Sequence, residues 1–218
     1  MNRLTEADVR VLGALIEKEM TTPDYYPLSL NALTAACNQA SNRDPVVSYD
    51  EDTVSQALDR LRRMSLARSI KRADSRVSKF SHNADETLSL SASEKAILCT
   101  LLLRGPQTVG ELKVRASRMA PFASTLEVEQ VLVTLGRREG APLVAHLPRR
   151  PGQKDGRYAH LLAGEVAAGG AVDPEDSVEQ QAAAGDGHLA TLKERVEELE
   201  KSLADLRSEF AAFRRQFE

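Results

Sequence analysis

Basic side chains crowd one short stretch of the sequence, residues 60–79, in a pattern suited to binding phosphate groups. Eight arginines and lysines stand there against Asp74 within the stretch and Asp59 beside it, a local charge of +6. Guanidinium and ammonium groups gain free energy at a duplex backbone because they release condensed counterions. The stretch therefore predicts a nucleic-acid surface made by Arg60, Arg62, Arg63, Arg68, Lys71, Arg72, Arg76 and Lys79.

A second, weaker basic stretch covers residues 137–157, where six bases oppose Glu139 and Asp155, a local charge of +4. Its members are Arg137, Arg138, Arg149, Arg150, Lys154 and Arg157. The whole chain has a net charge of −3 and a pI near 5.9, so any contact with nucleic acid must come from such local patches.

The remaining reactive residue types form no catalytic or metal-binding pattern. Four histidines are scattered without metal-ligand spacing, and the sequence contains neither a P-loop nor a G-x-S-x-G motif. We expect His82 and His160 to be structural, and Cys37 and Cys99 to be buried, reduced thiols of a cytosolic protein. The sequence therefore predicts no enzyme, no cofactor and no bound metal.

The first basic stretch lies on a helix and a hairpin. The helix is expected over Asp52–Met64, and the hairpin strands over Leu66–Ile70 and Val77–His82, joined by a basic turn at residues 71–76. The helix has one apolar stripe, made by Val54, Ala57, Leu58, Leu61 and Met64. A third helix that runs into a hairpin is typical of a winged helix-turn-helix, whose third helix enters the major groove while its wing reaches the phosphates.

Two earlier helices complete this unit. Thr5 and Asp8 can cap a helix that continues to Met20, and Ser29 can cap a second one over Leu30–Cys37. The polar loop that follows contains Asn38, Gln39, Asn42 and Arg43. These side chains could bond to phosphates and base edges, or they could hold the backbone of a long loop.

The same order of elements recurs in the second half of the chain, which indicates an internal repeat. The first helix of each half has the same apolar spacing: Val11, Leu12, Leu15 and Ile16 match Ile97, Leu98, Leu101 and Leu102. The third helices agree as well: Val54, Ala57, Leu58 and Leu61 match Val128, Val131, Leu132 and Leu135. We therefore expect two tandem winged helix-turn-helix domains, at 1–84 and 88–163, mainly α with small β-wings.

The last third of the chain changes character. Residues 164–187 are rich in Ala, Gly, Glu and Asp, as in a flexible linker, and residues 188–218 have apolar positions in a 3-4 spacing that predicts a coiled-coil helix. We expect a parallel homodimer, the alternative being a helix that folds back on the chain's own domains. The seam consists of Leu189, Leu192, Val196, Leu199, Leu203, Leu206, Phe210, Phe213 and Phe217.

Localisation follows from what the sequence lacks. No run of about 18 apolar residues is present, so we expect no membrane span. The first eight residues are polar and charged, without the apolar region of a secretory signal. The sequence therefore predicts a cytoplasmic protein.

Several strings of residues are similar to the YceH family of bacterial proteins. They include Glu17–Pro23, Tyr26–Asn31, Ala36–Gln39 and Asn42–Pro45 in the first half. In the second half they are Leu101–Gly105, Thr108–Leu112, and Pro151–Lys154 with Arg157-Tyr158. The resemblance covers about residues 4–162 and implies two tandem winged-helix domains, without an established activity. It places the linker and the heptad segment beyond the common core of the family.

These observations favour a DNA-binding, transcription-regulator-like protein. We expect double-stranded DNA to be contacted by Asn42, Arg43, Ser55, Gln56, Arg60, Arg63, Lys71, Arg72 and Arg76, and the second wing to offer Arg149, Arg150, Lys154 and Arg157. The competing hypothesis is a protein-protein interaction adaptor, because the third helix exposes Glu51, Asp52 and Asp59. In the second unit Glu127, Glu129 and Val133 favour contact with protein, or simple packing within the chain, over contact with DNA.

Overall fold

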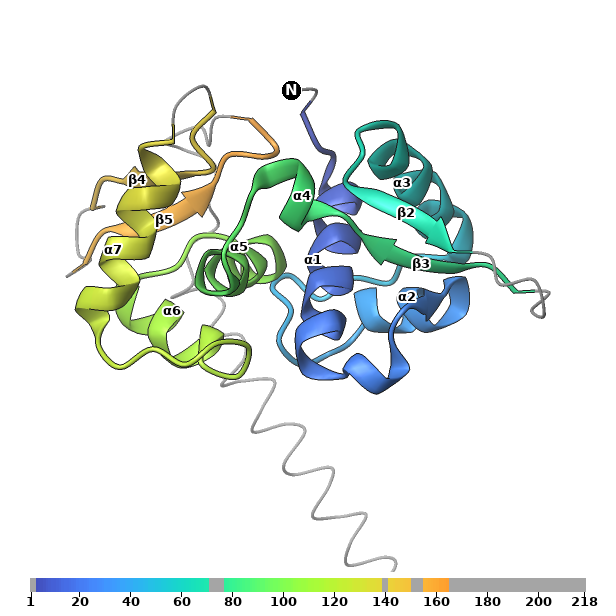
Figure 1. Cartoon of the computed structure of the whole chain (residues 1–218), viewed down its shortest axis with the longest axis horizontal. Helices are drawn as coiled ribbons and strands as arrows, with labels where there is room; N and C mark the ends of the chain where they lie inside the picture. The colour runs from blue at the N-terminus through green and yellow to red at the C-terminus, as the bar shows by residue number, and fades with distance from the viewer. Residues whose placement is uncertain (1–2, 71–76, 139–140, 150–154, 165–218) are drawn as a thin grey trace, which may run out of the picture. The chain divides into compact units, whose positions relative to one another are not determined.

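The computed structural model describes residues 3–70, 77–138, 141–149 and 155–164, which belong to one compact unit (Figure 1). Within these residues the protein is mixed, with seven α-helices and two small antiparallel sheets. None of the described helices is long and apolar enough to cross a lipid bilayer. The predicted linker at 164–187 and the predicted coiled coil at 188–218 fall outside the described residues, apart from residue 164.

The first half begins with three helices whose starts follow the expected caps. Thr5 and Asp8 form a complete capping box, the Ser29 side chain accepts from the backbone N–H of Ala32, and Asp50 caps the third helix. The observed bounds differ from the expected ones by about one residue. The helices are α1 (Glu6–Thr21), α2 (Leu30–Cys37) and α3 (Glu51–Arg63), and a 3-10 turn, η1 (Pro23–Tyr25), follows α1.

A three-stranded sheet completes the first half, in the order β1-β3-β2. The predicted hairpin is present, with Ala67 opposite His82 and Ile70 opposite Lys79. The sequence did not predict the edge strand, which pairs Leu28 with Phe80. The strands are β1 (Leu28–Ser29), β2 (Ala67–Ile70) and β3 (Lys79–His82).

The second half repeats this order of elements after a short helix, α4 (Ala84–Leu88), that the sequence did not predict. Gln107 forms an isolated bridge to Tyr158, at the place that β1 occupies in the first half. The elements are α5 (Ala92–Arg104), α6 (Val109–Ala116), α7 (Thr125–Gly136), β4 (Val144–Leu147) and β5 (Arg157–His160).

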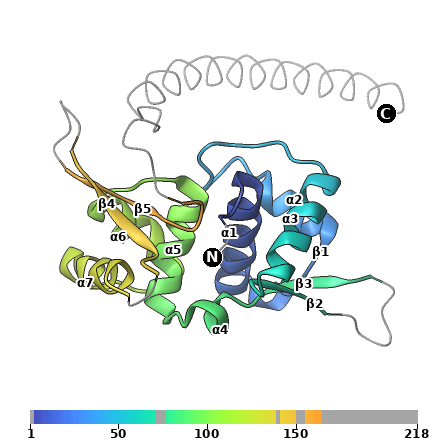
Figure 2. The same ribbon diagram turned by 90° about the horizontal axis from the view of Figure 1, so that it is seen from above.

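The two halves share one hydrophobic core, centred on α1 and α5, which lie side by side (Figures 1 and 2). Gly13 marks the closest approach, since a Cβ atom built there would lie 2.8 Å from Cδ2 of Leu103 and 3.2 Å from Cβ of Leu102. Cys99 donates its thiol hydrogen to the Gly13 carbonyl at 3.4 Å. The matched apolar residues of the repeat all belong to this shared core: Leu12, Leu15, Ile16, Ile97, Leu98 and Leu101 are buried.

We expect Gly13→Ala to lower the free energy of unfolding by about 1–3 kcal/mol, because the added methyl overpacks the contact between α1 and α5. Gly110→Ala is the matched control: Gly110 is exposed on α6, where a Cβ atom meets nothing within 4 Å. That change should leave the free energy of unfolding unchanged or raise it by at least a few tenths of a kcal/mol. Urea denaturation followed by circular dichroism measures both, and equal effects would contradict the close approach at Gly13.

Candidate nucleic-acid interface

The helix α3 buries four of the five residues of its predicted apolar stripe and turns a charged face to solvent; the fifth, Met64, follows the helix and is half-buried. Glu51 and Asp52 are exposed at its start, and Gln56 is exposed near its middle, while Ser55 is half-buried. The C-terminal turn carries the bases: the exposed Arg62 pairs with Asp59, Nη1 to Oδ1 at 3.0 Å, and the exposed Arg63 donates from Nε to the Asp59 carbonyl at 3.2 Å. The exposed face is therefore acidic at its N-terminal end and basic at its C-terminal end: Glu51, Asp52, Gln56, Asp59, Arg62 and Arg63.

Arg60 has a structural role that the sequence did not indicate. Its Nε lies 2.8 Å from Oδ1 of Asp8, whose side chain is buried on α1, and its Nη2 donates to Oγ1 of Thr5 at 3.4 Å. The Arg60 side chain is only 32% exposed. This ion pair holds α3 against the first turn of α1. Arg60 therefore positions the candidate interface and contributes little exposed charge to it.

The hairpin adds two exposed bases beside α3. Arg68 lies opposite Ser81 and donates to its Oγ from Nε at 3.1 Å, while Lys79 lies opposite Ile70. Side chains two residues apart on an antiparallel pair share one face, so Arg68 and Lys79 lie on the same face of the hairpin. The predicted wing residues Lys71, Arg72 and Arg76 lie outside the described part of the chain.

The loop before α3 is held by its own amide side chains. Asn38 donates from Nδ2 to the Tyr49 carbonyl at 2.7 Å and accepts from the Tyr49 N–H at 2.8 Å. Asn42, in the left-handed backbone region at φ 59°, accepts from Nη2 of Arg104 at 2.9 Å. Of the two roles open to these amides, the structure shows the bracing of the loop, and it ties the loop to α5.

Arg43 does not belong to the candidate interface, because its side chain has no exposed surface and cannot reach a phosphate. Its guanidinium forms a two-point ion pair with Glu17, at 3.0 Å from Nη1 and 2.5 Å from Nη2, and donates to the Ala36 carbonyl. Arg118 of the second half binds the same carboxylate. Burial alone would raise the pKa of Glu17, but the hydrogen bonds and charges of Arg43 and Arg118 outweigh burial and lower it.

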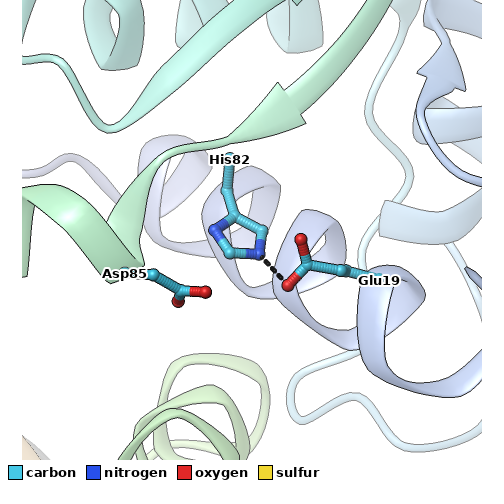
Figure 3. Close-up of side chains that lie close together, drawn as sticks. All are labelled: Glu19, His82 and Asp85. Carbon is cyan, nitrogen blue, oxygen red and sulfur yellow. Dashed lines mark hydrogen bonds and ion pairs between the residues drawn. The ribbon is translucent and has the colours of Figure 1, made fainter. Parts of the chain in front are cut away.

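A second charge cluster lies at the base of the hairpin (Figure 3). Glu19 of α1, His82 of β3 and Asp85 of α4 point toward one another, and their ligand atoms lie within 4.8 Å of one another. The residue types would suit a divalent metal. However, the Lys95 ammonium already lies 2.8 Å from Oε2 of Glu19 and 2.7 Å from Oδ2 of Asp85, so it neutralises the two carboxylates that a metal ion would need.

The hydrogen bonds of His82 also indicate a network of ion pairs and hydrogen bonds and not a metal site. Its Nδ1 accepts from the Ala84 N–H at 3.2 Å, and its Nε2 lies 2.7 Å from Oε2 of Glu19, so neither ring nitrogen is left for a metal in this arrangement. Its backbone N–H donates to the Tyr26 hydroxyl at 2.7 Å. The cluster anchors β3 to α1 and, through Lys95, to the second half.

The equivalent histidine of the second half has a different environment. Burial lowers the pKa of His160 to about 4, and its buried Nδ1 has no hydrogen-bond partner among the described residues. Arg157, which the sequence placed in the second basic wing, is paired with Glu111 at 3.1 Å and donates to the Pro106 carbonyl. Arg149 is exposed, whereas Arg150 and Lys154 lie outside the described residues.

A family model described as "Protein of unknown function, DUF480" matches residues 4–153, well over half of the chain. The chain belongs to this family. It is similar to a "UPF0502 protein" of Pelobacter propionicus, with 50% identity over 219 residues that cover 99% of this chain and 98% of the relative. A UPF0502 protein of Geobacter sulfurreducens is 51% identical over 207 residues, 93% of this chain and 90% of that protein.

The matches differ in whether they include the C-terminal segment. The family model ends at residue 153, in agreement with a common core that stops before the linker. The alignment with the P. propionicus protein nevertheless covers 99% of this chain, so it continues through the linker and the heptad segment. A UPF0502 protein of Opitutus terrae, by contrast, aligns over 163 residues at 55% identity, 75% of this chain and 71% of that protein. The C-terminal segment is therefore not peculiar to this chain.

The Glu19 carboxylate provides a pH-dependent test of the cluster. Hydrogen bonding from His82 lowers its pKa to about 2; burial opposes that shift, and Lys95 adds to it. A depressed carboxyl pKa contributes stability above the unfolded value near 4.5 and loses that contribution as the pH falls toward 2. We expect Glu19→Gln to cost about 1–2 kcal/mol at pH 7, a value reduced for solvent screening because the side chain is partly exposed.

Urea denaturation at pH 7 and at successively lower pH measures this difference, which should shrink toward zero as the pH approaches 2. Glu86→Gln is the control, because Glu86 is exposed on α4, and it should change stability by less than about 0.5 kcal/mol. A cost for Glu19→Gln that does not depend on pH would contradict the charge cluster.

Proposed function

We propose that the chain is a tandem winged-helix protein whose first half binds double-stranded DNA, as transcription regulators do. The order of three helices followed by a hairpin, present twice, supports the winged-helix assignment. The observation that carries the proposal is the set of exposed bases at the C-terminal end of α3 and on one face of the hairpin: Arg63, Arg68 and Lys79.

The exposed charges suggest how a duplex would lie on this surface. The carboxylates of Glu51 and Asp52 repel phosphates, so the backbone contacts would come from Arg63 and the hairpin. Gln56 lies near the middle of the exposed face of α3, where its amide can pair with an adenine edge in the major groove. The pair of Arg60 with Asp8 would keep α3 rigid on α1 during that contact.

The second half is less suited to the same role. At positions equivalent to Asp52 and Asp59, α7 carries Leu126 and Val133, and Arg157 of its hairpin is already paired with Glu111. Our proposal therefore assigns DNA contact to the first half alone. It assigns the chain no catalytic role.

The protein-binding adaptor is the alternative, and the exposed carboxylates Glu51 and Asp52 on α3 are the observation that favours it. A DNA-binding role would place the chain in the bacterial cytoplasm, in agreement with two buried free thiols, Cys37 and Cys99. We also infer that the chain is a YceH-type member of its family, on the similarity between its residue strings and that group.

For the C-terminal segment we propose a parallel coiled-coil homodimer through the apolar positions of residues 189–217. Light scattering should give a full-length mass of at least two chains, and a truncation after residue 165 should lower that mass. Equal monomer masses for the two proteins would remove the coiled-coil dimer. The alternative, a segment that folds back on its own chain, predicts that equality.

The DNA proposal predicts a specific loss of salt dependence. Each phosphate contact contributes about −0.9 to the slope of log affinity against log salt concentration. We expect the triple variant Arg63→Ala, Arg68→Ala, Lys79→Ala to weaken duplex binding at about 50 mM salt and to reduce that slope by about 2–3. Fluorescence anisotropy of a labelled random duplex across a salt series measures both quantities.

Arg137→Ala with Arg149→Ala is the matched control, since both bases are exposed in the second half. That double variant should bind as the unchanged protein does. If the triple variant and the control behave alike, the first half is not the DNA surface. If the unchanged protein binds no duplex at 50 mM salt, the adaptor is favoured, and affinity capture of proteins on the full chain becomes the next test.

A further inference from the structure

Because of the internal repeat, each residue of α7 can be compared with the residue at the equivalent position of α3. Val54 of α3 matches Val128 of α7, and both are buried. In that register Leu126 stands where α3 has Asp52, and Val133 stands where α3 has Asp59. Leu126 is 61% exposed and Val133 is 46% exposed. Two solvent-facing carboxylates of one repeat are thus replaced by two solvent-facing aliphatic side chains in the other.

These side chains belong to one stripe along the exposed side of α7. Four residues in 4-3-4 spacing lie on the same face of a helix, which is the pattern of a seam that packs against another helix. We call this stripe the α7 seam, and its members, all exposed, are Leu126, Gln130, Val133 and Arg137. The matching residues of α3 are Asp52, Gln56, Asp59 and Arg63, so Gln and Arg are shared and only the carboxylates are exchanged for aliphatic groups.

The α7 seam is separate from the candidate DNA surface. The helices α3 and α7 lie on opposite sides of the central α1–α5 pair in both views (Figures 1 and 2). A partner bound to α7 would therefore leave α3 and the β2–β3 hairpin accessible.

We propose that the α7 seam binds the α7 seam of a second copy of this chain, in an antiparallel arrangement about a two-fold axis. The charges along the helix favour this occupant. The exposed Glu129 lies in the first half of α7, and the exposed Arg137 directly follows its last turn. An antiparallel copy brings each acidic half beside the basic end of the other helix, which also opposes the two helix dipoles favourably.

Helix geometry shows that the pairing is self-consistent. Consider a two-fold axis that passes midway between Gln130 and Val133. With a rise of about 1.5 Å per residue, Glu129 then lies within about 4.5 Å of Arg137 of the second copy, measured along the helix axis. An arginine side chain spans that distance. The same two-fold axis sets Val133 opposite Gln130 of the second copy. The two Val133 side chains are then about 4.5 Å apart in the direction of the helix axis. Leu126 then packs on the methylene stem of Arg137 of the second copy.

A single helix face buries little surface, at the low end of specific interfaces, so we expect weak association unless another contact tethers the two copies. The pairing does not depend on DNA contact by the first half. It would also be compatible with a chain already paired through its C-terminal segment.

Cross-linking in the full chain tests the pairing directly. Gln130→Cys places a thiol next to the two-fold axis, whereas Gln56→Cys places one at the equivalent position of α3. The native thiols interfere little, because Cys37 and Cys99 are buried and burial raises the pKa of Cys37 to about 12. With a short bis-maleimide, we expect Gln130→Cys to form covalent dimers at least about tenfold faster than Gln56→Cys.

Three further variants in the Gln130→Cys background identify the contacts. Leu126→Asp with Val133→Asp gives α7 the residues of α3 and should lower cross-linking to the rate of Gln56→Cys. Glu129→Arg alone should slow it, and the addition of Arg137→Glu should restore it, because the swapped charges again attract. Thermal melting by circular dichroism checks that each variant folds.

Three results would each overturn the pairing: equal rates for Gln130→Cys and Gln56→Cys, no effect of the Asp variants, or no recovery in the double charge swap. Each readout is independent of DNA, so a failure of the DNA proposal would leave these rates unchanged. Conversely, DNA affinity through α3 should be the same in the Leu126→Asp, Val133→Asp variant and in the unchanged chain.

Discussion

The close packing of α1 against α5 at Gly13 is the constraint on which the rest of the structure depends. Neither half encloses its first helix alone, because Leu12 and Ile16 of α1 share one core with Ile97 and Leu101 of α5. A Cβ atom at Gly13 would lie 2.8 Å from Cδ2 of Leu103, so the leucine side chain or one of the helices would have to shift. The two charge clusters at the C-terminal end of α1 include Arg118 and Lys95 because this contact brings the second half within reach of Glu17 and Glu19.

Both clusters connect the proposed DNA surface to the second half. Glu17 binds Arg43 of the loop before α3 and also Arg118 beyond α6, so the loop is held from two sides. Glu19 binds His82 at the end of β3 and also Lys95 of α5, so the hairpin is anchored in the same way. Removal of one partner from the buried pair of Glu17 with Arg43 leaves an uncompensated charge, which is more costly than the loss of a surface pair. The second half therefore positions the first, whether or not it binds a ligand of its own.

Local patterns predicted most of the fold, and partners distant in sequence explain most of what was missed. Helix caps such as Thr5 with Asp8, and the apolar spacing of Val54 to Leu61, are visible in a few residues. The two-residue strand β1 and the five-residue helix α4 are too short to show a period. Arg43 looked like a phosphate ligand because its buried partner, Glu17, is 26 residues away. His82 was predicted to be structural, but its link to Glu19, 63 residues away, was not predictable from spacing.

Amide hydrogen exchange of the full chain, with and without a random duplex at about 50 mM salt, tests most directly where DNA binds. We predict new protection in the backbone of α3 and the β2–β3 hairpin, residues 51–82, and unchanged exchange over α7, residues 125–136. Protection that appears over α7 alone, or equally in both halves, would contradict a DNA surface confined to the first half. No change anywhere in the presence of duplex would contradict DNA binding itself.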